Sequence, residues 1–463
     1  MTNIFSQAIK RVKTALGNDA SNLDPQSLDP HIIPRDQHNI SRKNIGDLAL
    51  KVMTTLHKAG FAGFLVGGGV RDLLLGGHPK DFDIATDATP EQVKNLFRGA
   101  RIIGRRFKIV HVGYGRDVIE VTTFRGSHQP AEEAHKGKRP SNQKSVRSKD
   151  GMLLRDNVFG TVEEDAIRRD FTINALYYSN ADFAVYDYTN GMQDMKDRVI
   201  RIIGDPETRY REDPVRMLRA VRFAGKLNFD IETSTAAPIK ELAPSLSDIS
   251  SARMFDEVLK LFMSGYGVAT YELMQQHGLF EPLFPQTQHS LKDPAAQTLI
   301  MQALENTDKR IKQGKPVTPA FIYAALLWPP VNQRQQQLIS EGLPAVPAMH
   351  QAAQEVASKQ QHLTAVPKRF GIPMREIWDL QLRLPNRGGR KAEQLFENRR
   401  FRAAYDFMIL REQAGEDTGD VVQWWTDYQN RSPDQREAMS KALQNKGGKR
   451  RTRRKPSSQP KTH

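Results

Sequence analysis

Two aspartates one residue apart, Asp81 and Asp83, carry side chains that could hold metal ions. On a strand, residues i and i+2 point to the same face, so this spacing brings two carboxylates together. Carboxylate oxygens are hard ligands that suit Mg²⁺. A third carboxylate on a neighbouring strand would complete a two-metal site, and Glu120, which stands between apolar residues, is the candidate. An isolated pair of this kind is more often a solvated surface feature, so its neighbours in the sequence decide its meaning.

A run of three glycines, residues 67–69, directly follows a strand expected at 61–66 and precedes Arg71 and Asp72. Glycines let the backbone turn tightly and approach a phosphate closely. A glycine cluster alone usually marks only a turn. The order of strand, glycine turn, Arg-Asp pair and acidic pair favours a site that handles phosphates.

Two further segments carry charged side chains in useful positions. In residues 164–175, Arg168 and Arg169 suit triphosphate oxygens because a guanidinium group donates two parallel hydrogen bonds. In residues 212–219, Asp213 and Arg216 lie about one turn apart on a helix expected at 213–227, so together they offer an acceptor and donors to a base edge. The plain alternatives are a charged helix terminus in the first segment and a weak surface ion pair in the second.

The elements that must position these side chains alternate between strand and helix in the first half of the chain, which includes a strand expected at 81–85. After residue 204 only helical patterns remain. We therefore expect an α+β head, with a mixed sheet flanked by helices, and all-α neck and body domains. The expected boundaries are a polar leader at 1–44, the head at 45–204 with a mobile insertion at 126–151, the neck at 205–285, the body at 286–430 and a basic disordered tail at 431–463.

Charge and composition narrow the class of partner. The formal net charge is +15, and about half of this excess lies in residues 446–463, which hold eight Lys or Arg and no acid. Such a charge suits a polyanionic partner. The absence of cysteine excludes disulfides, thiolate zinc sites and a cysteine nucleophile. With no signal peptide and no apolar run of membrane-spanning length, we expect a cytoplasmic protein without stable membrane insertion.

Together these motifs resemble a known family. Residues 67–72 followed by Asp81-Phe82-Asp83 are similar to the catalytic signature of the polymerase-β-type nucleotidyltransferases, in the branch of bacterial poly(A) polymerases and bacterial-type CCA-adding enzymes. Residues 164–175 resemble the RRDFTxNA block of that branch, and residues 212–219 its EDxxR neck motif. Residues 102–112 look like the poly(A) polymerase signature, and the chain lacks the His-Asp dipeptide of an HD phosphohydrolase domain.

The resemblance implies a set of site residues. The catalytic residues would be Asp81, Asp83 and Asp170, and the metal ligands Asp81, Asp83 and Glu120, with either Glu120 or Asp170 as the third essential carboxylate. The nucleotide would be bound by Gly67, Gly68, Arg71, Asp72, Arg168, Arg169, Asn174, Asp213, Arg216 and Arg219. RNA would be bound by Arg105, Arg106, Lys449, Arg450, Arg451, Arg453, Arg454 and Lys455.

The resemblance also implies an activity: addition of AMP from ATP to RNA 3′ ends, with release of pyrophosphate and with two Mg²⁺ ions, or Mn²⁺, as cofactors. The partners implied are RNA 3′ ends, ATP and proteins of RNA decay, and a monomer is favoured. A CCA-adding tRNA nucleotidyltransferase is the alternative enzyme. A catalytically dead RNA-binding protein is the alternative from another class, against which the intact pair of Asp81 and Asp83 argues.

Overall fold

The computed structural model describes residues 29–79, 81–104, 108–114, 117–126, 146–147, 153–155 and 158–451, with the backbone alone at 114, 146–147, 153–155 and 444–451. The chain divides into two compact units, Met1–Ser245 and Leu246–His463. Each unit is described here by itself.

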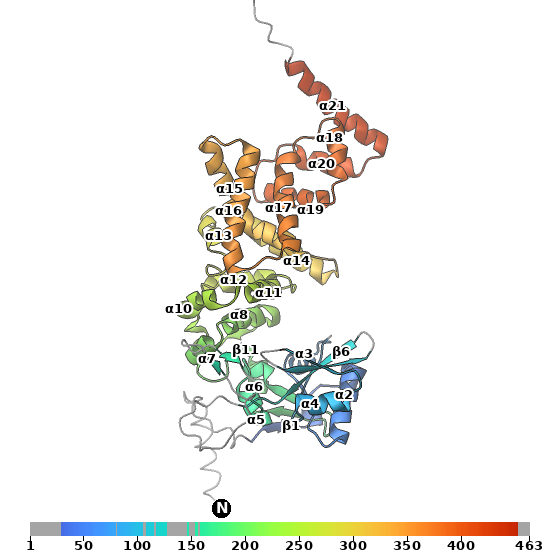
Figure 1. The fold of residues 1–463 in the computed structure, drawn as a ribbon, viewed down its shortest axis with the longest axis vertical. Helices are drawn as coiled ribbons and strands as arrows, with labels where there is room; N and C mark the ends of the chain where they lie inside the picture. Colours follow the sequence, from blue (N-terminus) through green and yellow to red (C-terminus); the bar gives the residue numbers. More distant parts are fainter. Residues whose placement is uncertain are drawn as a thin grey trace, which may run out of the picture. The chain divides into compact units, whose positions relative to one another are not determined.

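A mixed sheet forms the centre of the first unit (Figure 1). Within the described residues it has eight strands in the order β1-β10-β9-β2-β3-β6-β5-β4. β3 and β6 run parallel and the other neighbours antiparallel, so the expected mixed sheet is confirmed. The strands are β1 (His31–Ile33), β2 (Phe64–Val66), β3 (Asp83–Thr86), β4 (Arg101–Ile103), β5 (Ile109–Tyr114), β6 (Asp117–Thr123), β9 (Leu176–Ser179) and β10 (Val185–Asp187).

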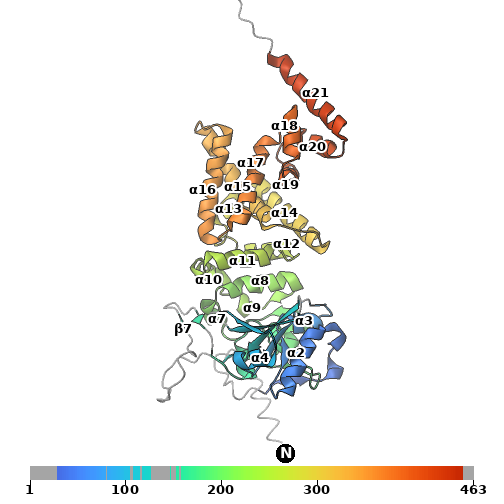
Figure 2. The same cartoon turned by 45° about the vertical axis from the view of Figure 1, so that its right-hand side comes forward.

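Helices cover the sheet and continue beyond it. α2 (Asp47–Lys58) and α4 (Pro90–Leu96) pack on one face of the sheet and bury Leu56 and Val93 (Figure 2). α3 (Gly68–Leu74) follows β2 directly. The remaining elements of this unit are η3 (Arg35–Gln37), η4 (Arg42–Asn44), β7 (Val146–Arg147), β8 (Leu153–Arg155), α5 (Val162–Ile167), η5 (Thr172–Asn174), α6 (Gly191–Asp197), β11 (Val199–Ile200), α7 (Pro206–Glu212), α8 (Val215–Leu227), β12 (Asp230–Ile231), α9 (Thr233–Ala236) and α10 (Ile239–Leu242), and η6 (Ala243–Asp248) crosses into the second unit.

The described part of the second unit is helical, as expected. Large aromatic side chains fill its core, and the fully buried Trp378 donates from its indole Nε1 to the carbonyl oxygen of Ala324 at 3.1 Å. The helices are α11 (Ser251–Phe262), α12 (Gly267–Gln276), α13 (Pro285–Ser290), α14 (Pro294–Lys312), α15 (Pro319–Ser340), α16 (Ala345–Leu363), α17 (Lys368–Arg383), α18 (Arg390–Phe396), α19 (Phe401–Gln413), α20 (Val421–Gln429) and α21 (Pro433–Arg451).

Both ends of the expected organisation need correction. The leader was expected to be loose through residue 44, but β1 lies in it and pairs with β10 at the edge of the sheet. The buried side chains of Ile33 and Ile40 explain why this short segment is ordered. The disordered tail was expected to begin at residue 431, but Pro433–Arg451 form helix α21, while residues 452–463 lie outside the described part.

Two expected elements are shorter than their patterns suggested. The strand expected at 81–85 begins only at Asp83, so Asp81 lies just before it. The helix expected at 213–227 begins at Val215, because Asp213 has extended backbone angles and closes α7 instead. Pro214 explains the break, since the residue before a proline is disfavoured in helical conformation.

The other expected boundaries, at 204, 285 and 430, stay predictions. Most of the insertion expected at 126–151 lies outside the described residues. Among the helices that the structure does describe, none is both long and apolar enough to cross a membrane.

Candidate active site

Three carboxylates gather where β3 and β6 run side by side. Asp83 is the register partner of Glu120 on the parallel strand β6. Asp81 and Asp83 are exposed while Phe82 between them is buried, which is the alternation that a shared face requires. The structure therefore places Glu120 beside Asp83, with Asp81 exposed two residues earlier, just before the strand.

The charges around Asp83 are mutually repulsive. Desolvation raises the pKa of Asp83, and the neighbouring Glu120 and Asp81 raise it further, while Arg169 opposes the shift. Glu120 Oε1 lies 3.3 Å from Nε2 of His111, its register partner on β5. Within the described residues, no three acidic or histidine side chains already form a group that could hold a metal ion. The carboxylates are thus neighbours in the sheet, and their metal-binding role stays a prediction.

The glycine turn lies at the end of β2, one strand away. Gly67 has φ of +69°, a conformation that favours glycine, and it precedes α3. Arg71 in α3 is buried and donates to Asp72 Oδ1 at 2.6 and 2.8 Å and to Asn174 Oδ1 at 2.6 Å. Its guanidinium group therefore links helix α3, which follows the glycine turn, to Asn174 in the segment after α5. This structural role does not depend on whether Arg71 also binds the nucleotide.

Arg168, Arg169 and Asp170 follow helix α5, whose start is fixed by a capping box. Thr161 accepts from the backbone N–H of Glu164, and the Glu164 carboxylate accepts from the N–H of Thr161. Burial lowers the pKa of Arg168 well below its usual value, and repulsion by nearby arginines, first of them Arg125, lowers it further. A cluster of arginine side chains that repel one another favours the binding of an anionic ligand.

Asp170 is held by hydrogen bonds rather than left open. It accepts from the N–H of Phe171 at 2.9 Å, from Asn174 Nδ2 at 3.2 Å and from Arg219 Nε at 2.6 Å. Burial alone would raise the pKa of Asp170. The charge of Arg219 and these hydrogen bonds outweigh this effect and lower the pKa of Asp170 to about 2. The predicted catalytic aspartate and the predicted nucleotide ligand Arg219 thus pair with each other.

The EDxxR segment lies across the break between α7 and α8, so Asp213 and Arg216 do not share a helix. Asp213 Oδ1 accepts from the N–H of Val215, the first residue of α8, at 3.3 Å. Arg216 Nη1 donates to Glu212 Oε2 at 3.0 Å and to the carbonyl oxygen of Arg209 at 2.6 Å. The ion pair of this motif joins Arg216 to Glu212, and a role in reading the base stays a prediction.

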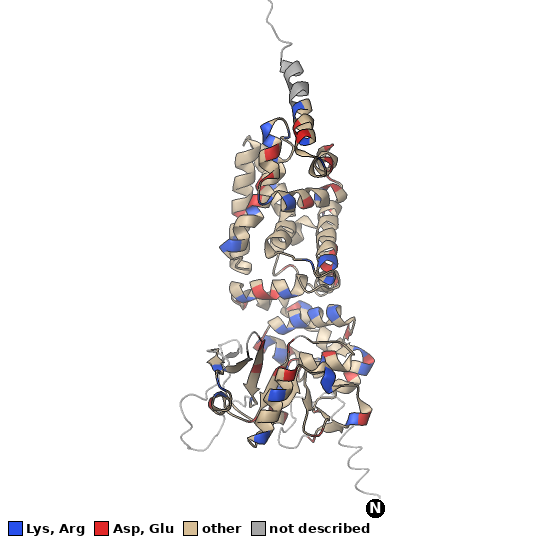
Figure 3. Ribbon diagram, turned by 90° about the vertical axis from the view of Figure 1, so that its right-hand side faces the viewer, with Lys and Arg blue, Asp and Glu red and all other residues tan. Residues whose placement is uncertain are grey.

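Helix α8 brings a row of cations to the site. It contains no acid (Figure 3), and its Lys226 Nζ lies 3.0 Å from Asp72 Oδ2 in α3. Phe223 of α8 lies against the guanidinium groups of Arg71 and Arg219 at 5.0 and 5.4 Å. The Lys and Arg residues of α8 are Arg216, Arg219, Arg222 and Lys226.

The predicted RNA-binding residues cannot be placed. Arg105 and Arg106 lie outside the described residues, as do Arg453, Arg454 and Lys455. Lys449, Arg450 and Arg451 belong to the last turns of α21, where only the backbone is described. Their role in RNA binding stays a prediction.

Sequence reasoning missed several residues of the site. Arg209 donates from Nη2 to the carbonyl oxygens of Arg168 and Arg169, at 2.7 Å each, and pairs with Glu212 at 2.8 Å. Its spacing of three from Glu212 was a signal for that pair. The spacing of four between Asp165 and Arg169 was a similar signal. His111 beside Glu120 and Tyr177 beside Arg169 gave no such local signal, because strand pairing and folding bring them together.

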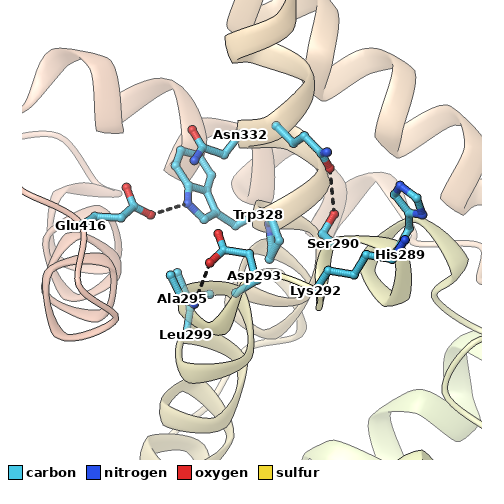
Figure 4. Close-up of a pocket in the computed structure, with 12 residues that line it drawn as sticks. His289, Ser290, Lys292, Asp293, Ala295, Leu299, Trp328, Asn332 and Glu416 are labelled. Carbon is cyan, nitrogen blue, oxygen red and sulfur yellow. Dashed lines mark hydrogen bonds between the residues drawn. The ribbon is translucent and has the colours of Figure 1, made fainter.

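A pocket in the second unit contains none of the predicted site residues. Its volume is about 360 Å³, and Trp328, Asn332 and Lys292 are among its lining residues (Figure 4). Trp328 Nε1 donates to Glu416 at 3.1 Å, and Asp293 accepts from the N–H of Ala295 at 2.9 Å. Its acidic groups are thus bound within the protein. We place the candidate active site at the carboxylates of the sheet and not at this cavity.

Known proteins resemble this chain over most of its length. Residues 63–201 match the family described as the poly A polymerase head domain, residues 228–291 the "probable RNA and SrmB-binding site of polymerase A", and residues 341–459 the polymerase A arginine-rich C-terminus. Among solved structures, the Thermotoga maritima CCA-adding enzyme in complex with tRNA aligns with a TM-score of 0.55 at 19% identity, over 86% of this chain and 85% of that one. At this identity the likeness shows the fold alone.

The head-domain match and the site define the chain as a nucleotidyltransferase enzyme. Poly(A) polymerase I of Salmonella typhimurium is 48% identical over 98% of both chains, and that of Escherichia coli O157:H7 is 48% identical over 97% of both. The CCA-adding enzyme of Lactobacillus helveticus is 38% identical over only 50% of this chain and 54% of its own. The chain therefore belongs to the bacterial poly(A) polymerase family.

Proposed function

We propose that this protein adds AMP from ATP to RNA 3′ ends without a template. The observation that carries this proposal is the extent of the similarity. Poly(A) polymerases match the chain almost from end to end, while CCA-adding enzymes match about half of it. The resemblance of residues 102–112 to the poly(A) polymerase signature supports the same choice.

In the proposed reaction the RNA 3′-hydroxyl oxygen attacks the α-phosphorus of ATP. A phosphodiester bond forms, the bond between the α-phosphorus and its bridging oxygen to the β-phosphate breaks, pyrophosphate leaves, and the hydroxyl proton passes to solvent. Reactions of this kind depend on positioning and on neutralisation of charge rather than on covalent catalysis. The protein must therefore hold the triphosphate against the carboxylates and the hydroxyl in line.

The acidic residues fit magnesium ions as cofactors. They supply hard oxygens only, and the raised pKa of Asp83 beside Glu120 reflects a surplus of negative charge that a divalent cation would relieve. Asp81 and Asp83 would hold the ions, with Glu120 as the third carboxylate. Magnesium bound there supplies positive charge for the attacking oxygen and the departing pyrophosphate.

Of the two candidates for the third carboxylate, Glu120 and Asp170, the contacts favour Glu120. Glu120 is the register partner of Asp83, whereas the carboxylate of Asp170 is already paired with Arg219. We assign Asp170 the task of fixing the start of α8 against the head. In that position it orders Asn174 and Arg219 around the bound nucleotide.

The alternatives predict different products from single nucleotides. The test offers a generic RNA primer with ATP, CTP, GTP or UTP alone, each with magnesium. A poly(A) polymerase makes long products with ATP only. Short CTP-dependent products would instead identify a CCA-adding enzyme, and no product with any nucleotide would identify a dead head that only binds RNA.

The cellular setting follows from the proposed substrates. A cytoplasmic location is proposed because ATP and RNA 3′ ends are found there. RNA itself is supported as a partner by the match of residues 228–291 to an RNA-binding region of polymerase A. Proteins of RNA decay remain proposed partners.

A further inference from the structure

Arg169 is held in a closed group of three hydrogen-bonded side chains. Its Nε donates to the Tyr177 hydroxyl at 2.8 Å, and its Nη2 donates to Asp165 Oδ2 at 2.9 Å. The Tyr177 hydroxyl in turn donates to the same Asp165 oxygen at 2.6 Å. Tyr177 is fully buried and Asp165 nearly so. We call these two residues the arginine clamp.

The clamp fixes both the charge and the direction of the guanidinium group. Burial alone would lower the pKa of Arg169. Tyr177 and Asp165 outweigh this effect and raise the pKa of Arg169, so the group stays cationic. Charge-assisted hydrogen bonds at two nitrogens of a planar fork leave little rotational freedom. The third nitrogen, Nη1, has no hydrogen-bond partner among the described residues.

The free nitrogen faces the glycine turn. A β-carbon added to Gly67 would lie 3.4 Å from Arg169 Nη1, in contact with it, so the glycine leaves this side of the donor uncovered. Arg169 is also close enough to Asp83 to oppose the rise in the pKa of that carboxyl. The open donor thus lies beside the turn, and its guanidinium group is near enough to Asp83 to affect it, where the proposed reaction needs a phosphate.

We propose that Asp165 and Tyr177 are positioning residues that present Arg169 Nη1 to a phosphate oxygen of the bound nucleotide at the Gly67 turn. This inference rests on the proposed function, since it names how that site holds its substrate. The clamp also gives the cation a permanent partner, Asp165. Without it, Arg169 would be free to pair with Asp83 and block the acidic site.

The strand itself supplies a matched control. Tyr177 and Tyr178 are consecutive residues of β9, so their side chains lie on opposite faces of the sheet. Both are fully buried, and Tyr178 contacts His38 on the other face. Tyr177→Phe and Tyr178→Phe each remove one oxygen atom from a buried ring, but only Tyr177→Phe loosens the clamp.

The test measures equilibrium binding of ATP and of inorganic tripolyphosphate to the full chain, without RNA, together with thermal unfolding. We expect Tyr177→Phe to weaken both affinities roughly tenfold, the effect of losing one hydrogen bond to a charged group. Tyr178→Phe should bind both ligands as the unmodified protein does. Unchanged binding in Tyr177→Phe, an equal loss in Tyr178→Phe, or a loss for ATP alone would each overturn the proposal.

A double-mutant cycle separates positioning from a general effect on folding. Arg169→Lys keeps a positive charge, but one ammonium group cannot contact the clamp and a phosphate in the same way. If Tyr177 acts through Arg169, adding Tyr177→Phe to Arg169→Lys causes no further loss of tripolyphosphate affinity. Additive losses would overturn the proposal. Because binding is measured without RNA, failure of the clamp is distinct from failure of AMP addition.

Discussion

The carboxylates of Asp83 and Glu120 stand on paired residues of two parallel strands, and Asp81 adds a third negative charge nearby. Like charges at such positions destabilise a folded protein unless a cation or a proton compensates them. A site that keeps this repulsion is arranged for a ligand rather than for stability. Removing one charge should therefore harm catalysis without harming the fold.

Replacing Asp83 by asparagine tests this separation. We expect Asp83→Asn to abolish AMP addition at saturating magnesium, while its thermal unfolding midpoint stays the same or rises slightly. Primer extension and calorimetry measure the two effects. Asp117→Asn, at an exposed position of β6, is the matched control and should retain activity. Normal activity in Asp83→Asn would remove this residue from the metal site.

The ion pair of Asp170 predicts a pH dependence of stability. Its pKa is about 2 in the folded protein against 3.8 for the free group, so the pair contributes about 2 kcal/mol of stability above pH 3.8. That contribution is lost as the pH falls from about 5 towards 2. The free energy of unfolding of the protein relative to Asp170→Asn should shrink over this range. A difference that stays constant from about pH 6 to 3.5 would contradict the assigned pairing.

The acidic residues and glycines of the candidate site were predictable because they are recognised from residue type and from spacing over a short stretch of sequence. Asp81, Asp83 and the glycines stand within a short stretch, and Glu120 was found from its apolar neighbours in a strand. The partners that hold these residues were not predictable in this way. Tyr177 reaches Asp165 across twelve positions, and Arg219 reaches Asp170 across forty-nine. Only the folded sheet and helix α8 bring such pairs together.

At the scale of elements, the break between α7 and α8 decides how the neck contacts the head. Because Asp213 ends α7, Glu212 and Arg216 face each other across the break, and Arg209 reaches the backbone after α5. Burial lowers the pKa of Arg209 to about 10, so it remains charged near neutral pH. One side chain thus fixes the carbonyl groups of Arg168 and Arg169, two residues predicted to bind the nucleotide.

Arg209→Met should therefore destabilise the protein by about 1–3 kcal/mol, because it leaves two partly buried carbonyl groups without their donor. Glu212 keeps Arg216 as its partner, so no unpaired charge complicates the result. Denaturant unfolding gives the free energy. Arg211→Met is the control on the same helix: its exposed pair with Glu207 should be worth well under about 1 kcal/mol. Equal effects of the two substitutions would refute the anchoring role of Arg209.

Element boundaries were less predictable than element types. The periodicity of residues 213–227 indicated a helix, and the structure has one, but Pro214 moved its start and changed which residues pair. β1 escaped notice because a strand of three residues in a polar, proline-containing segment has no measurable alternation. Its order comes from pairing with β10, which is distant in the sequence.

At the scale of the whole molecule, the positive charge is concentrated at the C-terminus. Residues 446–463 hold eight Lys or Arg and no acid, and the chain carries +15 overall. Helix α21 ends at Arg451, so this basic segment divides into a helical part and a part beyond it. Contacts with RNA phosphates release counterions, so each one steepens the salt dependence of binding.

Two truncations test the contribution of this segment to RNA binding. Ending the chain after Arg451 removes four positive side chains, and ending it after Asn445 removes all eight. Each lost phosphate contact should lower the slope of log affinity against log salt by about 0.7 for single-stranded RNA, so the slopes should fall in two steps, by up to about 3 and up to about 6. AMP addition at saturating RNA should survive both truncations, because the carboxylates proposed to be catalytic lie in the other unit. Identical slopes for all three proteins would show that the segment does not contact RNA, and the cations of the head and of α8 would then have to bind it.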